Sequence, residues 1–300
     1  FAGVSVGAAE VRKFLDRERV NRVVLLSDGL ANVGPDSPAE LGALGASLKK
    51  EGIAVSTIGL GLGYNEDLMA RLAGGSDGNH TFVEHPRDLA RIFDAEFGDA
   101  ISVTAQDVLV RIECAPGARP VRVLGRDAEI AGRMVVVTLN QLYAAQEQYV
   151  LLELEAPAGA SGEARRLAGV SWSFLRMGET PATEEGTRWV EASYSADDEL
   201  VAASEATDVM VAVVEQIATE QNRFAVDLRD QGRIEEAQMV LLKNTAYAKD
   251  KAQQYDSQIL ADVAMENEVD AETIVKQEQW KVQRKAMTEK QLIRSKQRKK

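Results

Sequence analysis

The chain has 300 residues, of which 45% are hydrophobic and 27% charged; this balance excludes general disorder and allows two or three domains with cores of their own. Its formal net charge of -12 argues against a general nucleic-acid-binding protein, because a surface that neutralises phosphates must be basic. A single cysteine, Cys114, and two histidines exclude an internal disulfide and a zinc-type cluster of Cys and His.

The first hundred residues alternate between helical and strand patterns. Val4, Ala8 and Val11 share one helical face, and the apolar run 23–26 then predicts a buried strand. Ser37-Pro38-Ala39-Glu40 is typical of a capping box and predicts a helix that ends near Gly52. We expect a strand at 53–60, a helix around 68–72, a strand at 80–84, and a helix from Pro86 with Leu89, Ile92, Phe93, Phe97 and Ile101 on its inner face. This order predicts a partial doubly wound, Rossmann-like parallel sheet with helices on both sides, over residues 1–102.

The pattern changes after Val103. Several short segments in which apolar and charged residues alternate, separated by turn residues, predict an antiparallel β-sandwich over residues 103–176. A polar run, GETPATEEG, predicts a linker over residues 177–196. Residues 197–300 have helical spacing, and the segment 231–237 predicts the bend of a helical hairpin. The third region is therefore expected to be α-helical, with a basic tail.

The charges are distributed unevenly along the chain. The tail, Lys276–Lys300, has ten Lys or Arg and two Glu, so residues 1–275 hold 25 basic and 45 acidic side chains. Such a tail could contact an anionic membrane, nucleic acid or an acidic partner, or it could be a solvated helix end. We favour the solvated end, because Trp280 is its only aromatic residue and no stacking platform for bases is present. No run reaches the roughly 18 apolar residues of a membrane span.

Two glycine-containing motifs have catalytic or nucleotide-binding alternatives. Gly3-Val4-Ser5-Val6-Gly7 matches a nucleophile elbow, and Asp28 with His80 or His85 supplies the Ser, Asp, His order of a hydrolase. Only two residues precede this motif and its spacing is helical, so Ser5 stays the alternative and we expect no enzyme. The two histidines flank a short strand and are expected at the surface or at an edge. The motif GLGLGY, 59–64, lacks the last glycine of a dinucleotide fingerprint and predicts a turn at the carboxyl edge of the sheet.

The stretch VVLLSDGLANVG, 23–34, resembles the fourth strand and following loop of a von Willebrand factor type A (VWA) domain, in which a strand ends in a T/S-D-G triplet. The segments IAVSTIGLGLGYNEDLMARLA and HTFVEHPRDLARIF are similar to the second half of bacterial VWA domains. The resemblance covers about the first hundred residues, and the later regions are similar to those of longer bacterial members. It implies a bacterial protein, of the cytoplasm or the cell envelope, in which residues 1–102 are the C-terminal half of a VWA domain.

In that family a divalent cation lies at the carboxyl edge of the sheet, in a metal-ion-dependent adhesion site (MIDAS). A D-x-S-x-S loop, a threonine loop and the aspartate of the later strand hold it, and Asp28 matches the last of these positions. The resemblance implies Mg²⁺, or Ca²⁺ or Mn²⁺, as the cation of the intact domain. It also implies a protein partner whose carboxylate completes the metal coordination, and an interaction or adhesion function.

The chain departs from the family pattern ahead of Asp28. No D-x-S-x-S occurs in it, and no threonine precedes Asp28. Since the family places both loops upstream, we expect Phe1 to fall just after the threonine loop, in a domain truncated at its N-terminus. One carboxylate is a poor Mg²⁺ site, because the ion needs several fixed oxygens. We therefore predict weak or no metal binding by this chain, and an unpaired edge on the strand that precedes Asp28.

Overall fold

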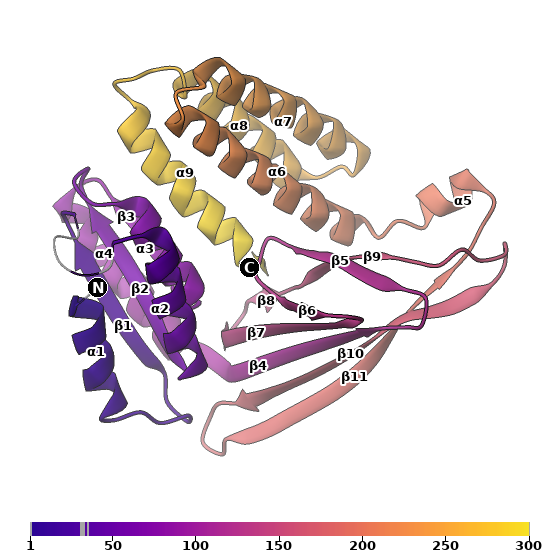
Figure 1. Cartoon of the computed structure of the whole chain (residues 1–300), viewed down its shortest axis with the longest axis horizontal. Coiled ribbons are helices and arrows are strands. Elements are labelled where there is room, and N and C mark those ends of the chain that lie inside the picture. The colour runs from indigo at the N-terminus through magenta and orange to yellow at the C-terminus, as the bar shows by residue number, and fades with distance from the viewer. Residues whose placement is uncertain (1, 31–33, 35, 300) are drawn as a thin grey trace.

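The computed structural model describes residues 2–30, 34 and 36–299. They form three parts (Figure 1): an α/β unit, residues 2–101; a β-sandwich, residues 103–193; and a helical region, residues 198–299. The expected fold class, a parallel α/β sheet followed by antiparallel sheets and C-terminal helices, is confirmed. Over the described ranges, no helix is both long and apolar enough to cross a membrane.

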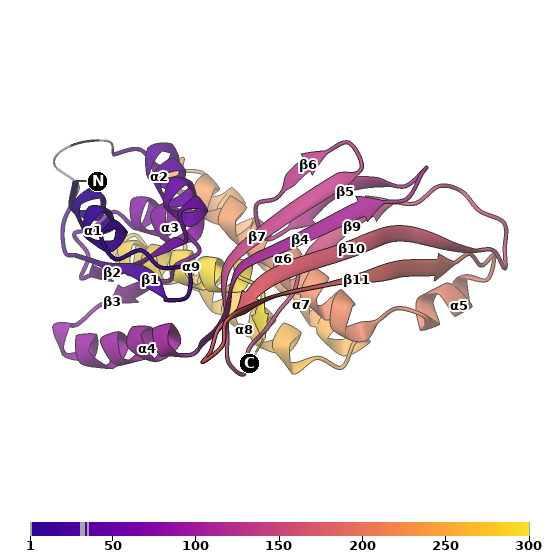
Figure 2. The ribbon, with the colours of Figure 1, turned by 90° about the horizontal axis from the view of Figure 1, so that it is seen from below.

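A three-stranded parallel sheet forms the centre of the α/β unit. Its strands are β1 (Asn21–Ser27), β2 (Ile53–Leu60) and β3 (His80–Val83), in the order β1-β2-β3. Helices α1 (Ala2–Arg12), α2 (Pro38–Lys50) and α3 (Glu66–Gly75) cover one face, and α4 (Leu89–Ile101), after the short helix η1 (Pro86–Asp88), covers the other (Figure 2). Side chains alternate between these layers, because Ile53 and Val55 pack against α1, α2 and α3 whereas Ile58 packs against α4.

Strand β1 lies at an edge of the sheet. It pairs with β2 from Asn21↔Ile53 to Ser27↔Gly59, and no described residue pairs with its other side. The predicted unpaired edge is therefore confirmed within the described residues. Leu26, near the end of β1, remains 45% exposed.

The prediction for the inner face of α4, the last helix of the unit, is only partly correct. Leu89, Ile92 and Phe93 pack against the sheet, but Phe97 and Ile101 are 61% and 88% exposed. The prediction for these two residues is wrong because helical spacing gives the direction of a side chain, not the extent of the surface opposite. The apolar cluster under α4 contains residues of its first half alone.

The β-sandwich consists of antiparallel strands. They are β4 (Val103–Cys114), β5 (Arg119–Leu124), β6 (Glu129–Ala131), β7 (Met134–Tyr143), β8 (Glu147–Gln148), β9 (Leu151–Glu155), β10 (Ala164–Arg176) and β11 (Ala182–Ser193). One sheet has the order β11-β10-β4-β7-β6, and β5 pairs with β9 in a second. Val123 of β5 and Leu152 of β9 pack on the core of the larger sheet, so the two sheets share one apolar layer.

The linker expected at 177–196 contains a strand instead. Residues 182–193 form β11, which pairs with β10 along its whole length. Its side chains are mostly exposed, and ion pairs such as Arg176–Glu184 and Arg166–Glu191 connect it to β10. The prediction failed because an edge strand in water has no apolar alternation to reveal it.

The helical region consists of α5 (Asp198–Ala203), α6 (Thr207–Asp230), α7 (Ile234–Gln254), α8 (Gln258–Thr273) and α9 (Trp280–Ser295). The predicted bend between α6 and α7 is confirmed, with Gly232 at a φ of 82°. Helix α9 lies between α6 and the α/β unit (Figure 1). The chain then forms β12 (Arg298–Lys299), which pairs with β8, so the C-terminal segment contacts all three parts.

Candidate functional site

Asp28 follows the last residue of β1 and lies at the carboxyl edge of the sheet, exposed to solvent. The hydroxyl of Ser27 donates to the carbonyl of Gly29 at 3.0 Å, which shapes the turn beneath it. The loop after β2 approaches from the neighbouring strand. A Cβ on Gly63 would lie 2.6 Å from the carbonyl oxygen of Asp28, so the two loops touch through backbone that admits no side chain at this position.

Two apolar side chains lie in the same pair of loops as the Asp28 carboxylate. Leu30, two residues after Asp28, is 64% exposed, and Leu62, in the loop after β2, is 46% exposed. This part of the sheet, Asp28 with Gly29, Leu30 and the loop 61–65, is named the carboxyl edge below. Ala31, Asn32 and Val33 of the family motif lie outside the described residues.

The described residues do not form a complete site for a divalent cation. Glu84 follows β3, two strands from Asp28, and strands spaced about 4.8 Å apart place the two chain positions roughly 10 Å from each other. A divalent cation needs several oxygens held at about 2.0–2.6 Å from it. In the part of the chain that the structure describes, no three His, Cys, Asp or Glu side chains are grouped to hold a metal.

The loop 61–65 continues into a buried polar cluster. The ring of Tyr64 covers Gly59, where a Cβ would meet ring carbons at 2.1 Å. His80 lies 5.9 Å from this ring, in an edge arrangement, and its Nδ1 is 2.9 Å from the hydroxyl of Thr57. His80 is only 2% exposed, so it does not lie at the surface, but its strand β3 is at an edge of the sheet, which was the other expectation. His85 is exposed as expected. Burial lowers the pKa of His80 to about 4, so the ring is neutral near pH 7.

Lys285 of α9 reaches this cluster from the helical region. Its ammonium group donates to the carbonyl of Tyr64 at 2.7 Å and to the carboxylate of Glu66 at 2.5 Å. It also lies 3.7 Å from the centroid of the Tyr64 ring. Burial acts to raise the pKa of Glu66, but hydrogen bonds from Lys285, its own backbone amide and Arg284 outweigh it and hold the pKa below its usual value. Glu66 is therefore an ionised carboxylate in the folded chain near pH 7.

Arg284 and Glu289 extend the contact along α9. Arg284 bonds Glu66 at 2.6 Å, Asp67 at 2.7 Å and Asp230 of α6 at 2.7 Å. Glu289 accepts a hydrogen bond from the backbone N–H of Phe82 in β3, and burial raises its pKa to about 7. Charged side chains of α9 thus contact the N-terminal end of α3 and strand β3.

The basic tail is not the solvated helix end that was expected. Besides Arg284 and Lys285, Arg294 bonds Glu266 at 2.8 Å and Lys296 donates to the side chain of Asn79 at 2.5 Å. Burial, with the nearby charge of Arg298, lowers the pKa of Lys296 well below its usual value. From the uneven distribution of charge along the sequence we expected the tail to face solvent or an external ligand. Instead, Arg284, Lys285 and Arg294 bind carboxylates of the same chain, and Lys296 binds Asn79. Membrane contact through the tail stays an untested alternative.

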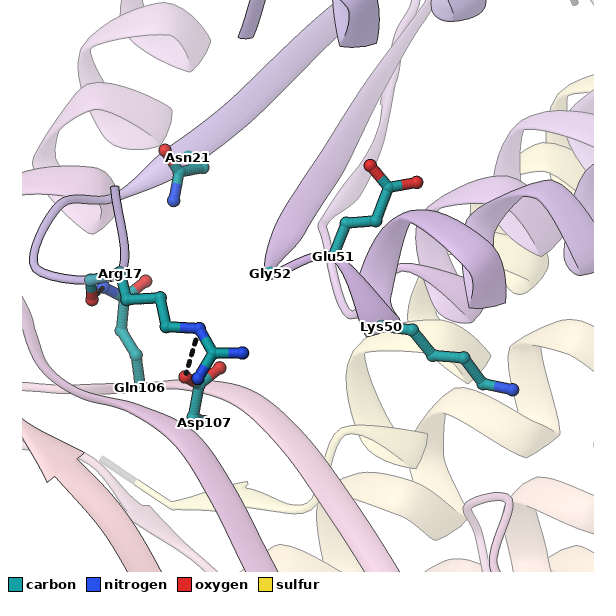
Figure 3. Close-up of a pocket in the computed structure, with 7 residues that line it drawn as sticks. All are labelled: Arg17, Asn21, Lys50, Glu51, Gly52, Gln106 and Asp107. Atoms are coloured by element: carbon teal, nitrogen blue, oxygen red, sulfur yellow. Dashed lines mark hydrogen bonds and ion pairs between the residues drawn. The ribbon is translucent and has the colours of Figure 1, made fainter. Parts of the chain in front are cut away.

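A small pocket lies at the junction of the α/β unit and the β-sandwich (Figure 3). Its lining residues are Arg17, Asn21, Lys50, Glu51, Gly52, Gln106 and Asp107. Arg17 and Asp107 form an ion pair of 4.0 Å across it, and the Lys50 side chain extends away from them. The cavity, about 20 Å³, is of the size that holds one water molecule. A wider hollow beside it, about 370 Å³, again contains Arg17 and Asp107.

The nucleophile-elbow alternative finds no support at Ser5. Ser5 lies inside α1, as its helical spacing predicted. An elbow needs a strand that delivers the serine into a tight turn. The hydrolase hypothesis therefore lacks its structural context at Ser5.

Solved structures with the same fold are VWA proteins. The chain superposes on the von Willebrand factor type A protein from Catenulispora acidiphila with a TM-score of 0.67 and 16% identity, over 83% of this chain and 60% of that one. It superposes on the ArnB paralog VWA2 from Sulfolobus acidocaldarius with a TM-score of 0.58 and 17% identity, over 95% of this chain and 68% of that one. These likenesses establish that the α/β unit has the VWA fold, as the resemblance at Asp28 predicted.

Similarity in amino-acid sequence covers a smaller part of the chain than these superpositions do. The chain is 28% identical over 116 residues to the Escherichia coli K12 protein named "Uncharacterized protein YfbK", which is 38% of this chain and 20% of that protein. The chain thus spans about a fifth of the length of this curated relative, and no family model matches it. Because both superpositions reach well beyond the α/β unit, the sandwich and helices that follow it are shared with the two solved VWA proteins as one arrangement.

Proposed function

We propose that this chain is a protein-interaction module rather than an enzyme, and that its carboxyl edge contacts the partner. The VWA fold is often used for protein interaction. The observation that carries the proposal is the exposed carboxylate of Asp28, with the exposed side chains of Leu30 and Leu62 in the same two loops. Apolar surface next to a single charge is the composition of many interface centres, where the charge adds specificity to the buried area.

The proposal includes a divalent cation bound between the carboxyl edge and the partner. Asp28 is one candidate ligand for Mg²⁺, Ca²⁺ or Mn²⁺, and a carboxylate of the partner is another. Because one carboxylate leaves most positions of such an ion to water, we expect the isolated chain to have no Mg²⁺ affinity in the micromolar range. Calorimetric titration of the chain with MgCl₂ measures this directly. Saturable micromolar binding that Asp28→Ala abolishes would contradict the expectation and would require ligands beyond those described.

Site-specific crosslinking tests the proposed edge. We would replace Leu62 by a photo-crosslinking amino acid in the tagged chain, express it in cells of the source organism and identify the captured protein. Asp28→Ala should lower this capture about tenfold, equivalent to about 1.4 kcal/mol of binding free energy. The matched control is Asp94→Ala. It removes an exposed carboxylate from α4, on the face of the sheet opposite α1, α2 and α3, and should leave capture unchanged. Equal capture by wild type and Asp28→Ala would reject the edge as the contact surface.

A further inference from the structure

We propose that Lys285 is a positioning residue, whose ammonium group fixes the loop 61–65 and thereby sets the shape of the carboxyl edge. The inference rests on the proposed function of that edge. It assigns to α9, 221 residues further along the chain than Tyr64, a role in presenting Asp28 to the partner. Lys285 acts here through the loop and does not itself face the partner, because it is 2% exposed.

One end of the loop is held against the ends of β1 and β3. The backbone N–H of Gly61 donates to the carbonyl of Val83 at 2.8 Å, and Gly61 has a φ of 68°, which suits glycine. Gly63 lies against the carbonyl of Asp28 so closely that a Cβ would be 2.6 Å from it. A shift of the loop by even one bond length therefore changes the contact on which the Asp28 turn rests.

The other end of the loop is held by α9. The carbonyl of Tyr64 accepts from Lys285, whose cation also lies over the Tyr64 ring. Hydrogen bonds that involve a charged donor, and cation–π contacts away from water, are stronger than their neutral or exposed counterparts. If the loop moved away, the buried ammonium group would lose two of its three described contacts and keep Glu66 alone. Moving the loop thus leaves a buried charge with fewer contacts, which is unfavourable away from water.

The same ammonium group also determines where α3 begins. Asn65 caps the helix, and its side chain accepts from the backbone N–H groups of Asp67 at 3.0 Å and Leu68 at 3.2 Å. Lys285 binds the residue before this cap, Tyr64, and the residue after it, Glu66. Two contacts on either side of a helix cap fix the direction in which the loop leaves α3. A continuous line of contacts consequently runs from α9 through the loop to Asp28.

Hydrogen–deuterium exchange of the full chain tests this line without any partner. In Lys285→Met, the amides of Gly61, Asp67 and Leu68 should exchange about tenfold faster, because opening the loop no longer separates a buried charge from its contacts. Lys285→Arg, which keeps a cation for the ring and for Glu66, should restore exchange close to that of wild type. Lys281→Met removes an exposed charge from the same helix and should leave these amides unchanged.

A second variant separates positioning of the loop from general docking of α9. Arg284 bonds Glu66, Asp67 and Asp230 but makes no hydrogen bond to the loop in the described residues. Loop exchange that rises equally in Arg284→Met and Lys285→Met, or that does not rise in Lys285→Met, would overturn the proposal. If Lys285→Met does not fold, Lys285→Gln is measured in the same way: faster exchange confined to the loop supports the proposal, and unchanged or uniformly faster exchange overturns it.

The two proposals can fail separately. Capture that is insensitive to Asp28→Ala would reject the proposed function and leave the exchange result for the loop as it stands. Normal loop exchange in Lys285→Met, together with Asp28-dependent capture, would reject the positioning role and leave the function. When both hold, Lys285→Met should also weaken capture at the edge, and Lys285→Arg should restore it.

Discussion

The α/β unit uses carboxylates in opposite ways at two places. At the carboxyl edge, Asp28 is exposed and lies on a turn at the end of a strand. At the α9 contact, Glu66 is 8% exposed and bonds both Arg284 and Lys285. An exposed carboxylate contributes little to folding and remains available to a new partner, whereas a buried one cannot be removed without leaving cations unpaired. The comparison fits the proposal that the carboxyl edge binds a partner, whereas the contact of Glu66 with α9 holds the parts of the chain together.

The largest change in stability is expected from a substitution of the buried carboxylate, Glu66. Glu66→Ala leaves the ammonium group of Lys285 buried without its carboxylate, and such losses lower the free energy of unfolding by about 3–5 kcal/mol. Urea unfolding followed by circular dichroism measures the change. Glu10→Ala, which breaks the exposed pair with Lys13, is the control and should change it by less than about 1 kcal/mol. Similar losses in both variants would remove the distinction between the sites.

A second test concerns the packing beneath the loop. In Gly59→Ala the new Cβ would meet the Tyr64 ring at 2.1 Å, so the ring must move and the stability should fall by about 1–3 kcal/mol. Gly42→Ala, inside α2 with no atom within 4 Å of the new Cβ, should instead stabilise the chain by about 0.5–1 kcal/mol. Both values come from denaturant unfolding. A stable Gly59→Ala with an unmoved loop would show that the Tyr64 ring has free space.

The third test uses pH. Burial raises the pKa of Glu289 from the ordinary 4.5 to about 7, so the folded chain binds this proton more tightly than the unfolded chain does. The stability from this group is complete below pH 4.5 and is lost as the pH rises to about 7. Glu289→Gln, which resembles the protonated acid, should therefore raise the free energy of unfolding at about pH 8 and leave it unchanged at about pH 4.

Comparison with wild type at each pH isolates this effect from other groups. The pKa of buried Asp270 is also raised, by burial, to about 6, and it shifts the stability of both proteins in the same direction. An equal effect of Glu289→Gln at the two pH values would mean that Glu289 keeps an ordinary pKa in the folded chain.

The smallest change in stability is expected at the carboxyl edge. Asp28→Asn preserves the shape and the turn-forming preference of the residue, so the free energy of unfolding should stay within about 0.5 kcal/mol of wild type. Capture of the partner should nevertheless fall, because the charge is lost. Thermal unfolding and crosslinking on the same preparation measure both quantities. A large loss of stability would mean that Asp28, like Glu66, stabilises the fold.

Local patterns predicted the elements of the α/β unit well. The capping box at Ser37 is present, and its hydroxyl accepts from the N–H of Glu40 at 3.3 Å. Residues 53–60 form β2 with the predicted bounds. The end of β1 before Asp28 was likewise visible, because a turn residue after an apolar run marks a strand end. Each of these signals lies within a few residues of the structure that it specifies.

The predictions that failed concern contacts between residues far apart in the sequence. His80 looked exposed because nothing near it in sequence covers it, whereas Tyr64, 16 residues earlier, packs against it in the fold. Strand β11 depends on cross-strand pairing with β10, and the tail cations depend on acidic residues of distant helices. An excess of acid in residues 1–275 was a signal that the basic tail had a partner within the chain, but the net charge does not name the pairs.

The amino-acid sequence alone determined the succession of strands and helices and the position of Asp28 at the end of β1, because hydrophobic periodicity and turn chemistry act over a few residues. Only the tertiary structure decided that Lys285 meets Tyr64 and Glu66, 221 and 219 residues away, and that α9 covers the α/β unit. The reason is physical: a charge selects its partner by distance and by the exclusion of water, and both exist only once the chain has folded.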